Sequence, residues 1–467
     1  MHEHAFAARA SSLIAGRDVA RTRTLFFCTD CGNETPRWAG QCPACGQWNT
    51  LVEQPAAATG RMAHRSDGVR TSAVVRLGDV PDAATTRHPT GIGELDFVLG
   101  GGLVPGSLVL VGGEPGIGKS TLLLQAAARL EADGVSTLYV SGEESARQVR
   151  LRADRLTPPA GDVSFLAATD LDVVLDAAAT AAPAVIFIDS VQTMHAPAIE
   201  GSAGNLTQVR ECAARLQRLA KERDVTVVLV GHLTKDGSVA GPRTLEHVVD
   251  TVLYFEGAPG ADHRVLRATK NRFGSADEIG VFHMTAGGLL PAADASAVFL
   301  AGRSEAGSGA AVAAAIEGTR PLLVEVQALC TRTAWGAPQR VANGFDRQRL
   351  ALLLAVIEKR AGVPFGQLDV FLNVAGGARL AEPAADLAVV AALLSSALDR
   401  PVPSTAVFAG EIGLGGEVRP VRQIERRLGE AARLGFETAW VPAAVQVNGL
   451  RVQPVRALET LTAQLFA

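Results

Sequence analysis

Between residues 91 and 291, short apolar runs alternate with longer amphipathic stretches. The apolar runs are SLVLVGG, TLYVSGEE, AVIFIDS, VTVVLVGH and TVLYFEG. Runs of Val, Ile and Leu without polar alternation are typical of parallel strands that are buried on both faces. The pattern predicts an α/β fold with a mostly parallel sheet and helices on both of its faces.

A different pattern begins near residue 300. The strand-like runs LLVEVQALC, DVFLNVAGG and TAVFAGEIGLGGEVRPV surround the amphipathic segment FDRQRLALLLAVIEKRAG. Apolar residues recur at helical spacing in that segment, so we expect a helix that packs on a sheet. These residues are Leu350, Leu353, Leu354 and Ile357. The pattern predicts a separate α+β domain.

The 467 residues of the chain are enough for two or three domains. We predict a disordered tail at residues 1–24, a cysteine-rich module at residues 25–52 and a linker at residues 53–88. The α/β domain is predicted at residues 89–291 and the α+β domain at residues 300–467. The linker is inferred from a stretch rich in Ala, Arg, Thr and Asp that has no sustained periodicity.

Composition narrows the environment of the chain. With 48% hydrophobic and 20% charged residues, it is not expected to be disordered or fibrous. No apolar run reaches the roughly 20 residues that span a bilayer. The N-terminal stretch lacks the apolar core of an export signal, so we expect a cytoplasmic protein. The net charge of −4 does not exclude nucleic acid, because a local basic surface is sufficient.

Four of the six cysteines form two CxxC pairs separated by ten residues. In a cytoplasmic chain this duplicated spacing predicts a closed tetrahedral Zn²⁺ site with a structural role, and a redox pair is the weaker alternative. The predicted ligands are Cys28, Cys31, Cys42 and Cys45. We expect Trp38 and Trp48 to cover the metal, with stacking on bases or on a partner as the alternative.

Residues 113–120 match the phosphate-binding sequence GxxxxGK[ST] without a mismatch, between a predicted strand and a predicted helix. Glycines let backbone N–H groups face phosphate oxygens, and the helix N-terminus favours anions. Lys119 is expected to reach the β- and γ-phosphates of ATP, and Ser120 to bind Mg²⁺. The predicted nucleotide-binding residues are Gly113, Glu114, Pro115, Gly116, Ile117, Gly118, Lys119, Ser120, Thr121 and Asp189.

Two further carboxylates complete the predicted ATPase site. Asp189 ends the run VIFID and is the expected second Mg²⁺ ligand, a role compatible with capping a helix. Glu143 and Glu144 follow the run TLYVS, and one of them is expected to orient or deprotonate the attacking water. We prefer Glu143. Glu144 and a helix-capping role for both acids are the alternatives.

These motifs, together with GIGELD at residues 91–96 and ATKNRFG at residues 268–274, resemble the bacterial RadA (Sms) family of DNA-repair ATPases in the RecA superfamily. The KNRFG run is that family's most specific signature, and here it is intact. The resemblance extends from Cys28 to the C-terminus. It implies a RecA-like P-loop core preceded by a C4 zinc finger and followed by a Lon-protease-like (S5-like) domain.

The resemblance also implies roles for basic residues. RecA-type cores hold the nucleotide between subunits, and Lys270 and Arg272 match the paired basic fingers of the DnaB-like helicases, which reach a neighbour's γ-phosphate. They lie two residues apart on an extended segment and so point the same way. A solvated basic turn is the alternative. His232 resembles the γ-phosphate sensor, with a structural role as the alternative.

By the same resemblance, the glycine-rich residues 194–207 and 234–244 correspond to loops that line a central channel and bind single-stranded DNA. Lys235 and Arg243 are the expected phosphate contacts, and flexible glycines suit loops that move with the ATP state. Ordinary surface loops are the alternative.

The C-terminal region resembles the Lon protease domain, whose hairpin GEIGLGGEVRPV matches. Proteolysis of that type needs a serine and a lysine. The matching positions hold Ala384 and Glu425, so we expect no peptide hydrolysis. A scaffold for assembly and DNA binding is expected instead. Its basic candidates, which could equally form a solvated helix face, are Arg419, Arg422, Arg426 and Arg427.

The resemblance thus implies a DNA-dependent ATPase of homologous recombination and repair. It would form a ring, expected to be a homohexamer, that moves on single-stranded DNA and promotes branch migration. The expected partners are single-stranded and branched DNA and a RecA-type recombinase. A RecA-like switch of the KaiC type without motor activity is the alternative, and the KNRFG run counts against it. An ATP-dependent protease is disfavoured by Ala384 and Glu425.

Overall fold

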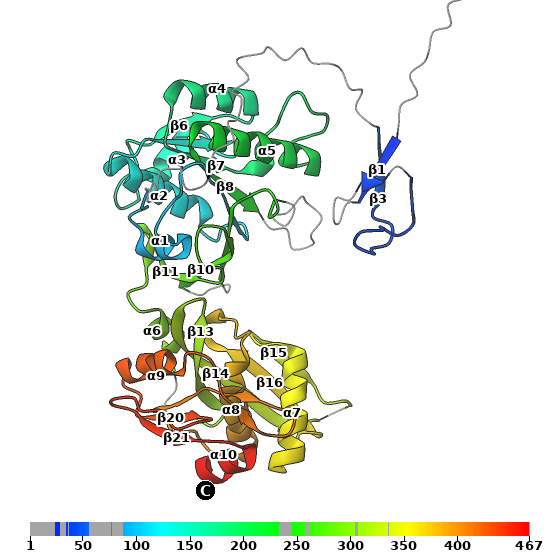
Figure 1. Ribbon diagram of the computed structural model, residues 1–467, viewed down its shortest axis with the longest axis vertical. Helices are drawn as coiled ribbons and strands as arrows, with labels where there is room; N and C mark the ends of the chain where they lie inside the picture. Colours follow the sequence, from blue (N-terminus) through cyan, green and yellow to red (C-terminus); the bar gives the residue numbers. More distant parts are fainter. Residues whose placement is uncertain are drawn as a thin grey trace, which may run out of the picture. The chain divides into compact units, whose positions relative to one another are not determined.

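The computed structural model describes residues 24–28, 34–35, 37–55, 76, 87–232, 245–257, 262–303, 307–334 and 336–466 (Figure 1). These residues divide into two compact units, one inside residues 1–81 and the other inside residues 82–467. None of the described helices is both long enough and apolar enough to cross a bilayer. Most of the predicted tail and linker lies outside the described residues.

The N-terminal unit contains a small antiparallel sheet in the order β2-β1-β3. Its strands are β1 (Thr24–Cys28), β2 (Glu34–Thr35) and β3 (Leu51–Pro55). Among the described residues, only Cys28, Cys42 and Leu51 form its buried apolar cluster. A cluster this small is not enough to stabilise a fold, which agrees with a module that depends on a metal.

The first lobe of the larger unit, residues 87–291, is called the core lobe here. Its described strands form a sheet in the order β12-β11-β10-β9-β4-β8-β7-β5-β6. Strands β4 to β9 pair in parallel, and β10 to β12 add an antiparallel edge. The prediction of a mostly parallel sheet is confirmed. The strands are β4 (Leu108–Gly113), β5 (Thr137–Ser141), β6 (Ser164–Ala167), β7 (Val185–Asp189), β8 (Thr226–His232), β9 (Thr251–Glu256), β10 (His263–Asn271), β11 (Ile279–Thr285) and β12 (Gly288–Pro291).

Helices cover both faces of this sheet (Figure 1). Val109 and Val111 of β4 share an apolar cluster with α2, and Leu108 and Leu110 share another with α5. Because alternate residues of a strand point to opposite faces, a strand covered on both sides is apolar throughout. The helices are α1 (Gly93–Leu99), α2 (Lys119–Ala132), α3 (Ala146–Ala153), α4 (Leu171–Ala181) and α5 (Leu206–Arg223), with a 3₁₀ turn η2 (Val191–Thr193).

The second lobe, residues 295–466, is called the C-terminal lobe here, and it has its own mixed sheet in the order β15-β16-β14-β13-β17-β20-β21. The predicted amphipathic helix is α7, and its four named apolar residues are buried. The strands are β13 (Ala310–Glu317), β14 (Arg320–Arg332), β15 (Arg340–Asn343), β16 (Leu368–Val374), β17 (Ala406–Phe408), β20 (Thr438–Val441) and β21 (Arg451–Pro454), beside a hairpin of β18 (Glu411–Ile412) and β19 (Val418–Arg419). The helices are α6 (Ala295–Leu300), α7 (Arg347–Ala361), α8 (Asp386–Leu398), α9 (Ile424–Arg433) and α10 (Leu458–Leu465), with the 3₁₀ turns η4 (Ala375–Gly377) and η5 (Pro383–Ala385).

The two lobes meet at the turn between β13 and β14. Arg320 of β14 donates two hydrogen bonds, of 2.6 and 2.8 Å, to the carboxylate of Glu94 in α1. Arg267 of β10 forms an ion pair with Glu317 of β13. Residues of β10, β11 and β14 also belong to one apolar cluster. The C-terminal lobe is therefore fixed to the same strands that flank the predicted nucleotide site.

Candidate active site

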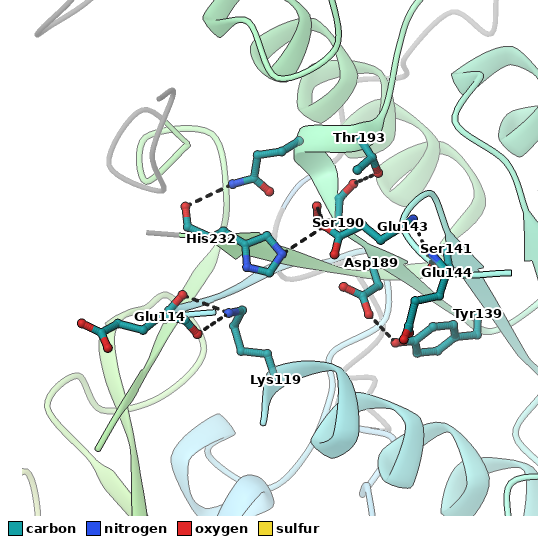
Figure 2. Close-up of polar contacts among 12 residues, drawn as sticks. Glu114, Lys119, Tyr139, Ser141, Glu143, Glu144, Asp189, Ser190, Thr193 and His232 are labelled. Atoms are coloured by element: carbon teal, nitrogen blue, oxygen red, sulfur yellow. Dashed lines mark hydrogen bonds and ion pairs between the residues drawn. The ribbon is translucent and has the colours of Figure 1, made fainter. Parts of the chain in front are cut away.

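The phosphate-binding loop (P-loop), residues 113–120, connects β4 to α2, as predicted. Gly113 begins it with φ 153°, and a side chain there would lie 2.9 Å from Phe255. Gly118, with φ 117°, is the N-cap of α2. Lys119 donates hydrogen bonds of 2.9 Å to the carbonyl oxygens of Gly113 and Glu114 (Figure 2). The ammonium group is thus held inside the loop, where a phosphate would accept its hydrogen bonds.

Burial lowers the pKa of Lys119 to about 8, while Asp189 and Glu143 oppose the shift. The side chain is therefore still mostly protonated at neutral pH, as phosphate binding requires. Ser120 and Thr121 follow in the first turn of α2.

Asp189 lies at the end of β7, where the sequence predicts a metal-binding carboxylate. Its side chain is 3% exposed, and Tyr139 donates a 2.8 Å hydrogen bond to Oδ2. The other oxygen, Oδ1, is buried and has no hydrogen-bond partner among the described residues. A buried carboxylate oxygen without a partner fits a Mg²⁺ ligand.

Glu143, after β5, faces Asp189 and His232 (Figure 2). Its Oε1 accepts a 2.5 Å hydrogen bond from Ser190 and lies 3.1 Å from Nε2 of His232. The bond to His232, joined by that to Ser190, lowers the pKa of Glu143 to about 2. Glu143 is therefore an ionised carboxylate that two neighbours hold in one orientation.

Glu144 is used differently, because it forms an ion pair with Arg152 of α3. Neither glutamate caps that helix. Ser145 occupies the N-cap, and Oε1 of Gln148 accepts a hydrogen bond from its backbone N–H. Of the two predicted candidates, Glu143 is the one that the fold brings next to Asp189 and His232. Its catalytic role stays a prediction.

Lys270 and Arg272 are not part of this cluster. The ammonium of Lys270 donates hydrogen bonds to the carbonyl oxygens of Glu246 and Val249, at 2.5 and 2.8 Å. Arg272 forms a 3.0 Å ion pair with Asp250 and is half exposed. Both residues are bonded to the segment 246–250, although Arg272 lies one residue beyond the end of β10.

The predicted DNA-binding residues Lys235 and Arg243 lie outside the described residues. The other predicted loop, residues 194–207, is described, and its first part is held in place. Buried Gln208 donates hydrogen bonds to the carbonyl oxygens of Ala196, Ile199 and Gly201, and its Oε1 accepts one from the N–H of Ala196. These bonds fix the backbone of residues 196–201 in this structure, and movement of the loop with the ATP state stays a prediction. The signal missed in the sequence is a glutamine on the apolar face of α5.

In the N-terminal unit, Cys28, Cys42 and Cys45 bring their sulfur atoms within 4.8 Å of one another. The sulfur atoms of Cys28 and Cys45 are 3.6 Å apart, close to the roughly 3.8 Å between thiolates around tetrahedral Zn²⁺. The predicted fourth ligand, Cys31, lies outside the described residues. The three described thiols fit the predicted zinc site.

Trp38 and Trp48 are 59% and 67% exposed, so neither is enclosed by the described residues, and their role in covering the metal stays a prediction. Both indoles approach Gly40, and the N–H of Trp38 donates a hydrogen bond to the carbonyl of Leu51.

In the C-terminal lobe, Ala384 is buried in η5, and Glu425 lies in the first turn of α9. Arg427 makes two 2.6 Å hydrogen bonds to Glu382 between these elements. Arg427 is 3% exposed, so its inclusion among basic DNA-binding candidates is wrong. This ion pair joins the N-terminal end of η5 to α9, the two elements that hold Ala384 and Glu425.

Strand β4, the P-loop, α2 and the carboxylates after β5 and β7 together define a RecA-like P-loop ATPase. Comparison with protein families agrees. The family described as "AAA domain" matches residues 80–238, "Rubredoxin metal binding domain" matches residues 26–53, and "Lon protease (S16) C-terminal proteolytic domain" matches residues 356–464.

Individual relatives are similar over nearly their whole length. The DNA repair protein RadA of Bacillus subtilis is 48% identical, over 91% of this chain and 94% of the relative. The protein of that name from Brucella abortus is 47% identical, over 96% and 99%. That of Pseudomonas aeruginosa is 46% identical, over 96% and 100%. The chain therefore belongs to the RadA family of DNA repair proteins, whose RecA-like domain implies ATP hydrolysis.

Proposed function

We propose that this chain is a ring-forming, ATP-driven motor on single-stranded DNA that promotes branch migration of recombination intermediates. A homohexamer is the proposed assembly, and branched DNA and a RecA-type recombinase are the proposed partners. The observation that carries the proposal is the separation of the predicted catalytic residues into two sets. Lys119 and Glu143 lie near the P-loop, whereas Lys270 and Arg272 lie at the end of β10.

The register of the strands gives the size of that separation. Phe255 of β9 lies opposite Gly113, whereas Lys270 of β10 lies opposite Val252, three residues earlier on β9. Lys270 is therefore displaced from the P-loop by three residues along the strand direction, about 10 Å. It is also displaced by two strand spacings across the sheet, from β4 to β10, which is again about 10 Å. Lys270 and Arg272 are also bonded to residues of the segment 246–250. This placement supports a role toward the nucleotide of a neighbouring copy.

In the proposed reaction, Lys119 binds the β- and γ-phosphates of ATP, and Glu143 accepts a proton from the water that attacks the γ-phosphorus. The bond from the γ-phosphorus to the bridging oxygen breaks, and ADP and phosphate leave. Mg²⁺ bound by Ser120 and Asp189 would neutralise charge on those phosphates. Ser190 and His232 both bond to Oε1 of Glu143. They therefore orient the carboxylate and leave Oε2 to receive the proton. Lys270 and Arg272 of an adjacent copy stabilise the charge of the transferred phosphoryl group.

The same cluster offers a route from the nucleotide to the proposed DNA loops. His232 ends β8, directly before residues 234–244, where Lys235 and Arg243 are the proposed DNA contacts. Gln192 of η2, which precedes residues 194–207, donates a 3.3 Å hydrogen bond to the carbonyl of His232. A change at the γ-phosphate would therefore reach η2, which precedes residues 194–207, through His232.

The proposal is tested by measuring ATP hydrolysis with and without single-stranded DNA, and branch migration of a three-strand DNA intermediate. We expect DNA to stimulate hydrolysis and migration to require hydrolysable ATP. The Lys119→Ala variant is the matched control, and it should neither hydrolyse ATP nor promote branch migration. If the chain hydrolyses ATP at the same rate with and without DNA and moves no branch point, the motor proposal is refuted. That result is expected of a KaiC-type switch.

A further inference from the structure

A groove flanks the P-loop on the side of β9. Glu114 and Ile117 of the P-loop form one wall, and Tyr254 and Phe255 at the end of β9 form another. The C-terminal lobe supplies one residue to this groove, Arg379. The cavity measures about 610 Å³, within the range of small-ligand sites.

Arg379 is presented by a segment that the core lobe holds in place. The carbonyl of Gly376 in η4 lies 2.6 Å from Nε2 of His263 on β10. Gly376 has φ 67°, and a side chain there would lie 2.8 Å from Phe299. Leu380 is buried immediately after Arg379. Between these fixed points Arg379 is exposed, and no hydrogen bond or ion pair joins its guanidinium to another residue of the described ranges.

The order of the strands indicates which part of a nucleotide would reach this groove. Asp189 ends β7 and Glu143 follows β5. Both strands lie beyond β8 on one side of β4, and β9 lies on the other. The γ-phosphate must be near the two carboxylates, because the attacking water and Mg²⁺ act there. The nucleoside therefore leaves the P-loop on the side of β9, where the groove begins.

The lining of the groove suits a nucleoside better than another phosphate. Besides Arg379 and Lys270 it contains the acids Glu114, Glu246 and Glu256, which would repel an additional anion. Carboxylates can accept hydrogen bonds from ribose hydroxyls. An arginine guanidinium stacks on the face of a purine ring.

We propose that Arg379 contacts the nucleoside of ATP bound to the P-loop of its own chain. The C-terminal lobe then contributes directly to nucleotide affinity. A bound nucleotide also adds a contact between the two lobes. This inference rests on the proposed ATPase function, and it adds the residue through which the second lobe recognises the substrate.

The test compares two ligands on the full-length chain. ATP contains the nucleoside, whereas inorganic tripolyphosphate can fill the P-loop without one. Affinities for both, with Mg²⁺, are measured by calorimetry or by competition for wild type and for Arg379→Ala. Arg379→Lys keeps the charge without the planar stacking group. Arg456→Ala, at another exposed arginine of the same lobe, is the matched control.

We expect Arg379→Ala to weaken ATP binding about tenfold, the scale of one base-stacking contact, and to leave tripolyphosphate binding unchanged. Arg379→Lys should recover only part of the loss, and Arg456→Ala should match wild type. Equal weakening of both ligands, or no change for either, would overturn the inference. If Arg379→Ala does not fold, Arg379→Gln replaces it. Wild type that binds neither ligand would instead refute the P-loop assignment and the proposed function with it.

Discussion

The two oxygens of the Glu143 carboxylate are used differently, and this decides what the residue can do. Ser190 and His232 both bond to Oε1, whereas Oε2 makes no hydrogen bond with a described residue. An oxygen that is free and attached to a fixed carboxylate is suited to accept a proton from a positioned water. Glu143 and Glu144 therefore differ in their contacts. Glu143 has an oxygen available at the site, whereas Glu144 forms an ion pair with Arg152.

We predict that Glu143→Gln reduces the rate of ATP hydrolysis by about 10²-fold or more, the usual contribution of a general base. The amide cannot take the proton, but it keeps the size of the side chain. ATP affinity should therefore change little. Steady-state hydrolysis and equilibrium ATP binding are the two measurements.

Glu144→Gln is the matched control for that substitution, since it alters the neighbouring residue in the same way. It should hydrolyse ATP at a rate close to wild type. A Glu144→Gln variant as inactive as Glu143→Gln would show that the assignment of the base is wrong.

Among the elements, the strands and the P-loop could be predicted, because each is determined by a short run of consecutive residues. Val109 to Val111 are apolar since β4 is covered on both faces, and the spacing of Gly113 and Gly118 matches a local turn. Gln208 and Arg379 could not be predicted in the same way. Their partners come from other segments of the chain, and no sequence spacing records those contacts.

We predict that Gln208→Leu loosens residues 196–201. The substitution removes the donor to three backbone carbonyls and leaves that of buried Ala196 without it, a cost of about 1–3 kcal/mol for an unsatisfied buried group. Amide hydrogen exchange at Ala196 and Ile199 should become faster. Arg218→Ala, on the exposed side of the same helix, is the control and should leave exchange unchanged. Unaltered exchange in Gln208→Leu would mean that other contacts hold the loop.

We predict that the N-terminal unit loses its metal when one thiol is removed. Wild type should contain one zinc ion per chain, and Cys28→Ser should contain none, because a tetrahedral site with three thiolates binds much more weakly. The measurement is elemental analysis of the purified proteins. Cys330→Ala, a cysteine in the C-terminal lobe, is the control. Full zinc content in Cys28→Ser would exclude Cys28 as a ligand.

In the larger unit, an ATPase core is joined to a lobe that carries Ala384 and Glu425 at the positions predicted for the protease serine and lysine. Among the described residues, two ion pairs cross the junction between the lobes, Glu94 with Arg320 and Arg267 with Glu317. Strand β10 carries Arg267 toward that junction and Lys270 farther along. The C-terminal lobe is therefore attached to the strand that bears the proposed fingers.

We predict that Glu94→Gln destabilises this unit by about 3 kcal/mol, because it leaves the guanidinium of Arg320 at a largely buried junction without its counter-charge. The measurement is urea unfolding of the full-length chain. Arg150→Ala, which breaks an exposed ion pair with Asp154, is the control and should have a much smaller effect. Equal effects of the two substitutions would show that the junction pair stabilises no more than a surface pair.

We propose that each nucleotide is shared by two copies of the chain, and this sharing can be tested by mixing two inactive variants. Lys119→Ala lacks the P-loop lysine, and Arg272→Ala lacks the finger. In mixed rings about a quarter of the sites would combine an intact P-loop with an intact finger from the next copy. DNA-stimulated ATP hydrolysis, absent in each variant alone, should return in the mixture. A mixture that stays as inactive as its components, or an Arg272→Ala variant as active as wild type, would contradict it.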